Sequence, residues 1–252
     1  MEYISEPAVI VAIAAAGPRE RLLTFLTGDK GGVRLYARRL SRRTTSTTFF
    51  EPLQGGELVY TLARERSFGR LTSFVPMRVW PGIRRDLGRT FHALAFLELI
   101  TMSVTEGESQ PELFTQLVQF LNRLEGESRP GLARVVATLR LLVRLGFEPN
   151  LESCVGCRAG VPAGTGVLLS PEGGGVVCRS CLPTRGERTI PVTPGAHGFM
   201  VRALSLPEGQ ARRLRTSPAV EREVSRLLDA FVEARTGVRP RSGAYIERVV
   251  GG

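Results

Sequence analysis

Cys154-Val155-Gly156-Cys157 and Cys178-Arg179-Ser180-Cys181 are the stretches that decide how the second half of this chain folds. Each is a C-x-x-C pair, twenty residues separate the two pairs, and together they hold all four cysteines of the chain. Zn²⁺ takes four thiolates tetrahedrally, and two residues between ligands allow a tight turn that directs both sulfurs to one ion. The spacing therefore predicts one structural zinc site, a folding element without an open catalytic position, whose ligands are Cys154, Cys157, Cys178 and Cys181.

Two other interpretations of the cysteines are two disulfides and four unrelated core thiols. The second is disfavoured because every cysteine belongs to one cluster. No secretory signal is visible, since the first apolar run, residues 8–16, is too short to span a bilayer and follows acidic residues. We therefore expect a cytoplasmic protein with no membrane partner, and a reducing compartment favours zinc over disulfides. Between the pairs, glycines surround Val167-Leu168-Leu169, which predicts a short hairpin.

The distribution of charge points to an anionic partner. The 252 residues carry a net charge of +10, and 42% of them are hydrophobic, enough for one to three cored domains. Residues 1–80 hold twelve basic and seven acidic side chains (+5), residues 81–180 ten of each, and residues 181–252 again twelve and seven (+5). Lys30 is the only lysine, and the planar guanidinium of arginine suits bidentate contact with phosphate. The balance predicts nucleic-acid binding, with anionic membranes or an acidic protein as alternatives.

The first eighty residues have the pattern of short strands. Apolar segments lie at residues 9–13, 21–26, 57–62 and 71–79, and Val33, Leu35 and Ala37 alternate with polar neighbours. Gly28-Asp29-Lys30-Gly31-Gly32 is a strong hairpin turn. Five short strands favour a small closed barrel, most simply a five-stranded OB-fold that binds DNA, although an SH3-like barrel would give a similar pattern.

Helices are expected after Trp80-Pro81-Gly82. Residues 91–102 are apolar nearly all round, and amphipathic stretches follow at 111–126, 130–146 and 218–237, with proline at the start and glycine at the end. We therefore predict a multi-domain α+β protein. Its parts are an OB-fold domain (1–80), an α-helical domain (81–150 and 190–237), a four-cysteine zinc-finger module (151–189) and a tail (238–252).

Catalytic constellations are sparse. His92 falls inside the apolar helix and is expected in the core, and His197, at a predicted helix start, is expected at the surface or in packing. Glu106 and Glu108 fall in a turn between helices, where a solvated loop is expected, and no phosphate-binding G-x-x-x-x-G-K-[ST] motif occurs. We predict that the protein is not an enzyme. A zinc-dependent nucleic-acid enzyme is the alternative, and it would need an oxygen ligand on the metal.

A run of arginines is the main candidate for DNA contact. Five arginines lie within residues 34–43 with no acidic residue among them, and five hydroxyl residues follow at 44–48. Such side chains suit phosphate oxygens, whereas Tyr36, Phe49 and Phe50 offer stacking surfaces, with a core role equally open for the two phenylalanines. A solvated strand and loop is the alternative. The predicted DNA-binding residues, including a second group before the last helix, are Lys30, Arg34, Tyr36, Arg38, Arg39, Arg42, Arg43, Arg212 and Arg213.

Taken in order, these features resemble the RecO family of recombination mediators. The resemblance is most specific where a helix ends in G-x-x-P-x-L-x-x-C-x-x-C, here Gly146 to Cys157. Three departures are that Arg158 stands where the family usually has glycine, Pro18-Arg19-Glu20 replaces an acidic Gly-Glu, and the basic loop is arginine–threonine. The other segments that carry the resemblance are Leu22-Leu23-Thr24-Phe25-Leu26-Thr27, Arg84-Arg85-Asp86-Leu87, Ala95-Phe96-Leu97-Glu98-Leu99 and Leu139-Arg140-Leu141-Leu142.

The resemblance implies a DNA repair accessory protein built from an OB domain, a helical domain and a zinc module. Similar proteins bind single- and double-stranded DNA and anneal complementary strands. With RecR, sometimes with RecF, they load RecA onto DNA coated by the single-stranded DNA-binding protein, and they recognise the acidic C-terminal tail of that protein. The implied location is the cytoplasm, in association with the nucleoid. A protein–protein adaptor whose DNA contact is incidental is the alternative function.

Overall fold

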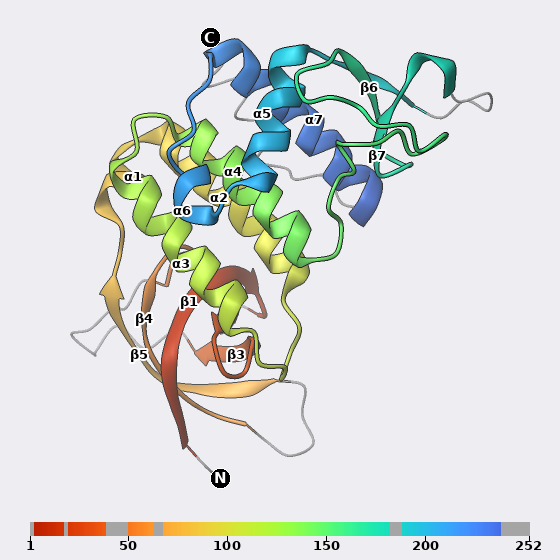
Figure 1. Ribbon diagram of the computed structural model, residues 1–252. Coiled ribbons are helices and arrows are strands. Elements are labelled where there is room, and N and C mark those ends of the chain that lie inside the picture. The colour runs from red at the N-terminus through yellow and green to blue at the C-terminus, as the bar shows by residue number, and fades with distance from the viewer. Residues whose placement is uncertain (1–2, 18–19, 39–49, 63–67, 182–187, 238–252) are drawn as a thin grey trace. The chain divides into compact units, whose positions relative to one another are not determined.

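The computed structural model describes residues 3–17, 20–38, 50–62, 68–181 and 188–237 (Figure 1). The side chains of Arg38 and Glu208 are outside this description. Contacts between residues divide the chain into two compact units, Met1–Gly126 and Glu127–Gly252, and each is described by itself.

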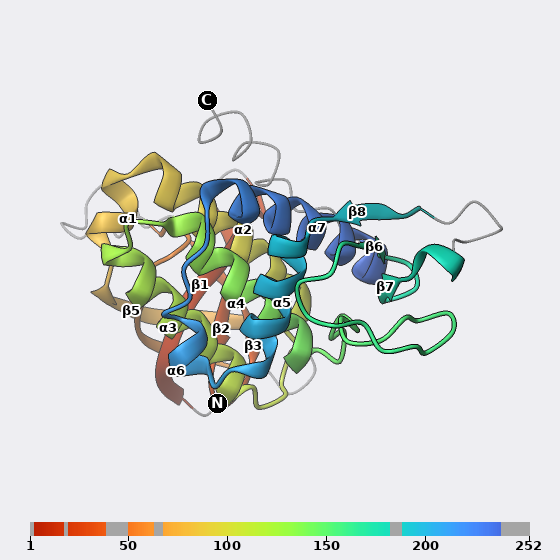
Figure 2. The same cartoon turned by 45° about the horizontal axis from the view of Figure 1, so that its top comes forward.

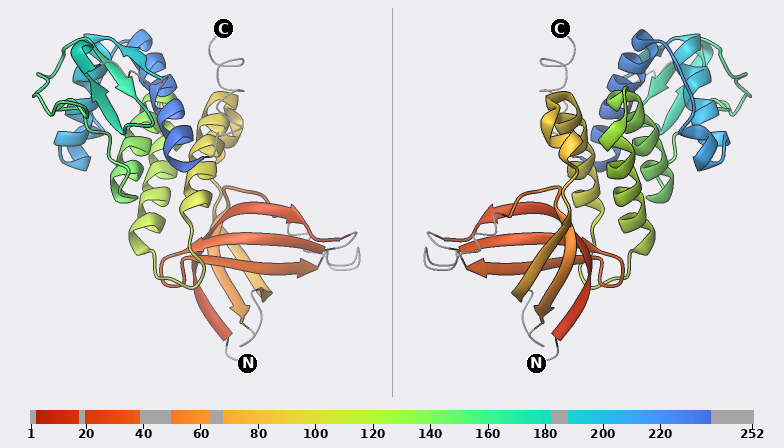
Figure 3. Two further views of the ribbon diagram at one scale, coloured as in Figure 1. Left: turned by 90° about the vertical axis from the view of Figure 1, so that its right-hand side faces the viewer. Right: turned by 90° about the vertical axis from the view of Figure 1, so that its left-hand side faces the viewer.

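The first unit contains a closed barrel, which Figure 3 shows from two sides. Its strands follow the order β1-β2-β3-β5-β4, and a short parallel pairing of β3 with β5 completes the ring. This five-stranded closed barrel confirms the predicted OB-fold. The strands are β1 (Tyr3–Ala15), β2 (Glu20–Thr27), β3 (Gly32–Arg38), β4 (Gly55–Thr61) and β5 (Gly69–Arg78).

Alternate side chains of the strands fill the barrel. Leu23, Phe25, Leu35 and Leu58 are completely buried, as the two-residue period of the sequence predicts. Among them lies Tyr60, whose hydroxyl donates a 2.6 Å hydrogen bond to the buried carboxylate of Glu6. Burial, followed by this bond to a carboxylate, raises the pKa of the Tyr60 phenol far above its ordinary value.

Three helices complete the first unit: α1 (Pro81–Arg85), α2 (Leu87–Ser103) and α3 (Pro111–Gly126). The connection between α2 and α3 pairs with the turn between β2 and β3. Gly32 N–H donates to the carbonyl of Thr105 (2.8 Å), and Gln110 N–H donates to the carbonyl of Gly28 (2.9 Å). Gly31 is required here, because at its φ of +58° an added Cβ would lie 2.2 Å from the Glu108 carbonyl oxygen.

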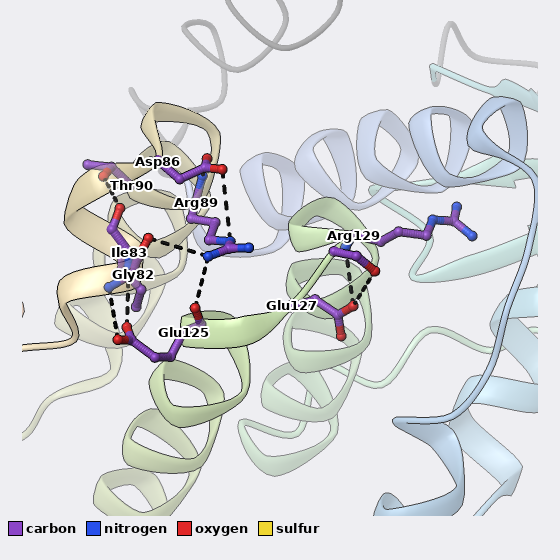
Figure 4. A network of polar contacts seen from close by, with 9 residues as sticks. Gly82, Ile83, Asp86, Arg89, Thr90, Glu125, Glu127 and Arg129 are labelled. Carbon is purple, nitrogen blue, oxygen red and sulfur yellow. Dashed lines mark hydrogen bonds and ion pairs between the residues drawn. The ribbon is translucent and has the colours of Figure 1, made fainter.

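A polar network fixes the start of α1 against the end of α3 (Figure 4). The carboxylate of Glu125 accepts hydrogen bonds from the backbone N–H of Gly82 (2.8 Å) and of Ile83 (3.2 Å). Arg89 donates to the Glu125 carbonyl at 2.9 Å, and the Thr90 hydroxyl donates to the Ile83 carbonyl at 2.7 Å. The two bonds to the Glu125 carboxylate satisfy free N–H donors of a helix that begins at Pro81, shortly after the last strand, and the other two satisfy backbone carbonyls.

In the part of the chain that the structure describes, the second unit consists of four α-helices, a short 3₁₀ helix at Arg179–Cys181 and a small sheet. The α-helices are α4 (Pro130–Arg144), α5 (Pro194–Ser205), α6 (Glu208–Ala211) and α7 (Pro218–Thr236). The strands β6 (Val167–Ser170), β7 (Gly175–Val177) and β8 (Ile190–Val192) form an antiparallel sheet in the order β7-β6-β8. The sheet lies beside α7 (Figure 2), where Arg235 donates to the Glu172 carbonyl at 3.3 Å.

Most predicted elements are confirmed: the five barrel strands, the four long helices and the 167–177 hairpin. The sequence pattern does not predict α1, α6 and β8, which span only three to five residues each, and it predicts only the start of α5. The predicted division into four domains stays a prediction. In the part of the chain that the structure describes, no helix combines the length and the apolarity that crossing a membrane requires.

Candidate metal centre and nucleic-acid face

The four cysteines come together, as their spacing predicts. Their sulfur atoms all lie within 4.8 Å of one another, and the Sγ atoms of Cys157 and Cys178 are 3.8 Å apart. Four sulfurs arranged tetrahedrally around zinc at about 2.3 Å stand roughly 3.8 Å from one another, so the cluster fits such an ion. All four cysteines are free thiols, and their single cluster disfavours both alternative interpretations.

Short backbone turns bring the ligands together. Arg158 N–H donates to the Cys154 carbonyl at 2.8 Å, which closes the first C-x-x-C turn, and Cys181 N–H donates to the Cys178 carbonyl at 3.0 Å. Glycine suits the junction at position 156, because a Cβ there would lie 3.0 Å from the Cβ and 3.2 Å from the sulfur of Cys181. Arg158 has a φ of +63°, in the left-handed region that favours glycine. Glycine, which the resemblance implies at this position in similar proteins, would adopt this backbone without steric cost.

The thiols of Cys154 and Cys181 have pKa values shifted in opposite directions. The N–H of Cys178 donates to the buried sulfur of Cys154 at 3.3 Å, and this bond, together with those from the N–H groups of Cys157 and Gly156, lowers the Cys154 pKa to about 6. The side chains of Cys157 and Cys178 raise the pKa of Cys181 to about 12, because they favour its neutral thiol. A metal that binds all four as thiolates must therefore displace protons.

The segment before the cysteines is part of the same module. The backbone N–H of Asn150 donates to the Gly174 carbonyl (3.0 Å), and the Asn150 carbonyl accepts from Val176 N–H (2.8 Å). The Asn150 side chain accepts from Ser153 N–H at 3.1 Å. A Cβ on Gly175 would lie 2.4 Å from the Asn150 carbonyl oxygen, so glycine permits this close approach. The module is thus built on strand β7 and on the end of the G-x-x-P-x-L motif.

The predicted basic residues on the barrel have different surroundings. Lys30 lies exposed in the turn between β2 and β3. Arg34 is half-buried on β3 and forms an ion pair with Glu106. No acid lies within residues 34–43, but the fold brings Glu106, 72 positions further along the chain, to Arg34 as its ion-pair partner. The expected solvated loop is confirmed, because residues 105–109 are exposed between α2 and α3, although Gly31 and Gly32 also form bridges with Glu106.

Tyr36 lies on the outer side of β3 with 40% of its surface exposed. Its ring meets the ring of Phe68 edge-on, with centroids 5.3 Å apart, and the Arg34 guanidinium lies over the Phe68 ring, 4.9 Å from its centroid. The sequence pattern did not single out Phe68, because no alternation of apolar and polar residues precedes it. Phe50 is partly buried against the barrel core, which favours the core role over stacking.

The remaining candidates lie outside the described residues or in the second unit. Arg39, Arg42, Arg43 and Phe49 are outside the described residues, as is the side chain of Arg38. Arg212 is half-buried and Arg213 exposed, after α6.

The two histidines are buried, and neither approaches the cysteines as a further ligand. His92 lies within α2, as expected. His197 is in packing rather than at the surface: its Nε2 atom lies 2.7 Å from the Leu151 carbonyl oxygen. Among the described residues, the four cysteines form the only cluster of three or more potential metal ligands.

Comparison with known proteins agrees with this architecture. The family model described as "Recombination protein O C terminal" matches residues 84–244. Three relatives bear the name DNA repair protein RecO. That of Desulforudis audaxviator is 29% identical, that of Anaeromyxobacter sp. (strain K) 30%, and that of Anaeromyxobacter dehalogenans (strain 2CP-1) 31%. Each alignment covers 99% of this chain and 98% of the relative. With its barrel, its helices and its four clustered cysteines, the chain belongs to the RecO family of DNA repair proteins.

Proposed function

We propose that this protein is a DNA repair and recombination mediator that binds single- and double-stranded DNA and anneals complementary strands. Membership of the RecO family supports the repair role. The observation that carries the DNA contact is the OB-fold barrel whose segment of the chain, residues 1–80, holds a net charge of +5. Exposed basic side chains on the described part of this barrel are Arg21, Lys30, Arg70 and Arg78.

Annealing requires no nucleotide and no catalytic group. Two complementary strands repel each other through their phosphates, and a basic surface that holds both strands lowers this repulsion. We propose accordingly that the protein is not an enzyme. The contacts would recognise the phosphates and the shape of the DNA backbone. DNA binding would therefore depend strongly on salt concentration and weakly on base sequence.

We propose one structural Zn²⁺ in the four-cysteine module. The support is the fit of four clustered sulfurs to the tetrahedral geometry of zinc. Zinc held this way stabilises the fold of the module, and four thiolates leave no position for a reactive water. X-ray absorption of the purified protein tests this, since an oxygen atom in the first coordination shell would argue instead for zinc-dependent catalysis.

The proposed partners are RecR, sometimes with RecF, and the acidic C-terminal tail of the single-stranded DNA-binding protein. Through them the protein would help to load RecA onto coated DNA. The alternative is an adaptor whose DNA contact is incidental. Capture of the protein by the acidic tail without DNA at moderate salt, compared with its binding to bare DNA, separates the two functions.

The decisive experiment is strand annealing on bare and on coated DNA with the double variant Arg39→Glu, Arg43→Glu. We expect weaker binding to all sequences and a salt dependence whose log–log slope falls by about 1 for each lost phosphate contact. The matched control is Arg85→Glu, Arg179→Glu, which changes the net charge equally in exposed residues of the electrically neutral 81–180 region. Unchanged affinity and slope in the first variant would show that the loop after β3 is not the DNA surface.

A further inference from the structure

We propose that Tyr36 is a stacking platform for one unpaired base, which Phe68 and Arg34 hold in position. This inference deepens the proposed DNA-binding function and rests on it. It assigns a base-contacting residue on the outer face of the barrel and gives single-stranded DNA a contact that a duplex lacks.

The position of Tyr36 on the barrel suits this role. In β3 it stands between Leu22 of β2 and Arg70 of β5, so its row crosses three strands. Strand β3 belongs to the outer face on which OB-folds bind oligonucleotides. Arg70 is exposed beside the tyrosine, where it can meet the phosphate that follows a stacked base.

A chain of contacts holds the platform. Glu106 forms an ion pair with Arg34, the Arg34 guanidinium lies 4.9 Å from the centroid of the Phe68 ring, and the Phe68 ring meets Tyr36 at 5.3 Å. A lone exposed tyrosine is ordinary on a protein surface. Tyr36, by contrast, is held by the Phe68 ring, and the ion-paired Arg34 covers that ring. Tyr36 therefore loses less conformational entropy when a base stacks on it.

This arrangement gives Arg34 a different role from its basic neighbours. Glu106 neutralises the charge of Arg34, and the Arg34 guanidinium covers the Phe68 ring. A phosphate would therefore have to displace Glu106 to reach Arg34. Arg34 is therefore a positioning residue for the platform. The base faces that Tyr36 can meet are covered in a duplex by neighbouring base pairs, so the platform acts on unpaired strands only.

The test compares Tyr36→Leu with the wild-type protein on single- and double-stranded oligonucleotides, one of them carrying the fluorescent base 2-aminopurine. Alanine substitution of a stacking aromatic weakens single-strand binding by a factor of roughly 5 to 150, and leucine, which lacks a π-face, should act similarly. We expect this loss for single strands, unchanged affinity for duplex and an unchanged salt slope. The quenching of 2-aminopurine that stacking produces should disappear in Tyr36→Leu and persist in Tyr36→Phe.

Tyr3→Leu is the matched control, because Tyr3 is an exposed tyrosine of the same barrel, on β1. Arg34→Gln should weaken single-strand binding without changing the salt slope, whereas a phosphate contact would lower that slope by about 0.7. Equal single-strand affinity and equal quenching in Tyr36→Leu and wild type would overturn the platform and leave DNA binding intact. Absence of DNA binding by the wild-type protein would instead overturn the proposed function itself.

Discussion

Arg158 is one of three non-glycine residues with a positive φ among the described residues, together with Leu53 and Trp80. Arg158 is exposed, and its left-handed backbone lets its N–H close the turn onto Cys154. A non-glycine residue in this region costs about 1 kcal/mol or more.

We expect Arg158→Gly to stabilise the second unit by about 1 kcal/mol, because glycine adopts this backbone without steric cost. The measurement is thermal unfolding of the metal-loaded protein together with its rate of metal loss to a chelator. Arg179→Gly is the control, since Arg179 is also exposed and near the cysteines but has no positive φ. A decrease in stability for Arg158→Gly would show that the arginine side chain contributes more than its backbone costs.

Single residues also show where prediction from the sequence ended. The spacing of Cys154, Cys157, Cys178 and Cys181 was sufficient to predict the metal cluster, because all the information is local. The ion pair of Arg34 with Glu106 could not be predicted, since the two residues are 72 positions apart and join only through the tertiary fold. The role of Phe68 could not be predicted for the same reason, because it depends on contacts with Tyr36 and Arg34 of a neighbouring strand.

At the scale of elements, α4 and α7 are joined by an unusual polar contact. Arg134 of α4 has 2% of its side chain exposed. Its guanidinium donates to Asp229 of α7 at 3.0 Å and also to the hydroxyl of Ser225. A buried charge that keeps its partner is tolerated, whereas one that loses it is strongly destabilising.

Asp229→Ala should therefore destabilise the second unit by up to about 3 kcal/mol, since it leaves the buried Arg134 with the neutral Ser225 hydroxyl but without an opposite charge. The double variant Arg134→Met, Asp229→Leu should recover most of this loss, because it removes both charges and keeps apolar volume between the helices. Urea unfolding of both variants measures the difference. A double variant less stable than Asp229→Ala would show that the ion pair itself stabilises the packing of α4 on α7.

Element boundaries followed simple chemical rules where the elements were long. Proline begins α3, α4 and α7, and glycine ends or follows them, so these bounds could be predicted closely. Strand β8 has three residues, too few for any period to be seen, and pairs with β6 only in the folded module. Helix α1 spans five residues and depends on Glu125, 42 positions after Ile83, for its first hydrogen bonds.

At the scale of the whole molecule, the two compact units allow the role of the metal to be separated from that of the barrel. All four cysteines lie in Glu127–Gly252. Trp80, the only tryptophan of the chain, is buried in Met1–Gly126. Its fluorescence therefore reports the unfolding of the first unit, whereas circular dichroism reports both.

Removal of zinc by a strong chelator, or Cys178→Ser, should lower the unfolding temperature of the second unit, because metal binding contributes to its folding free energy. The transition seen by Trp80 fluorescence should stay unchanged, and so should the affinity for bare DNA if the barrel is the DNA surface. Treatment with zinc-saturated chelator is the control. A parallel decrease in both transitions would mean that the barrel unit depends on the metal as well.

The pairing of the 28–32 turn with residues 104–110 has a consequence for the growing chain on the ribosome. The last barrel strand ends at Arg78, yet the groups that bond to the turn between β2 and β3 are made nearly thirty residues later. At roughly 5–20 residues per second, translation leaves an interval of a few seconds. We expect that during this interval the barrel strands have been synthesised while Gly28 and Gly32 lack these partners. The nascent barrel unit is therefore incomplete until the residues that follow α2 have been synthesised.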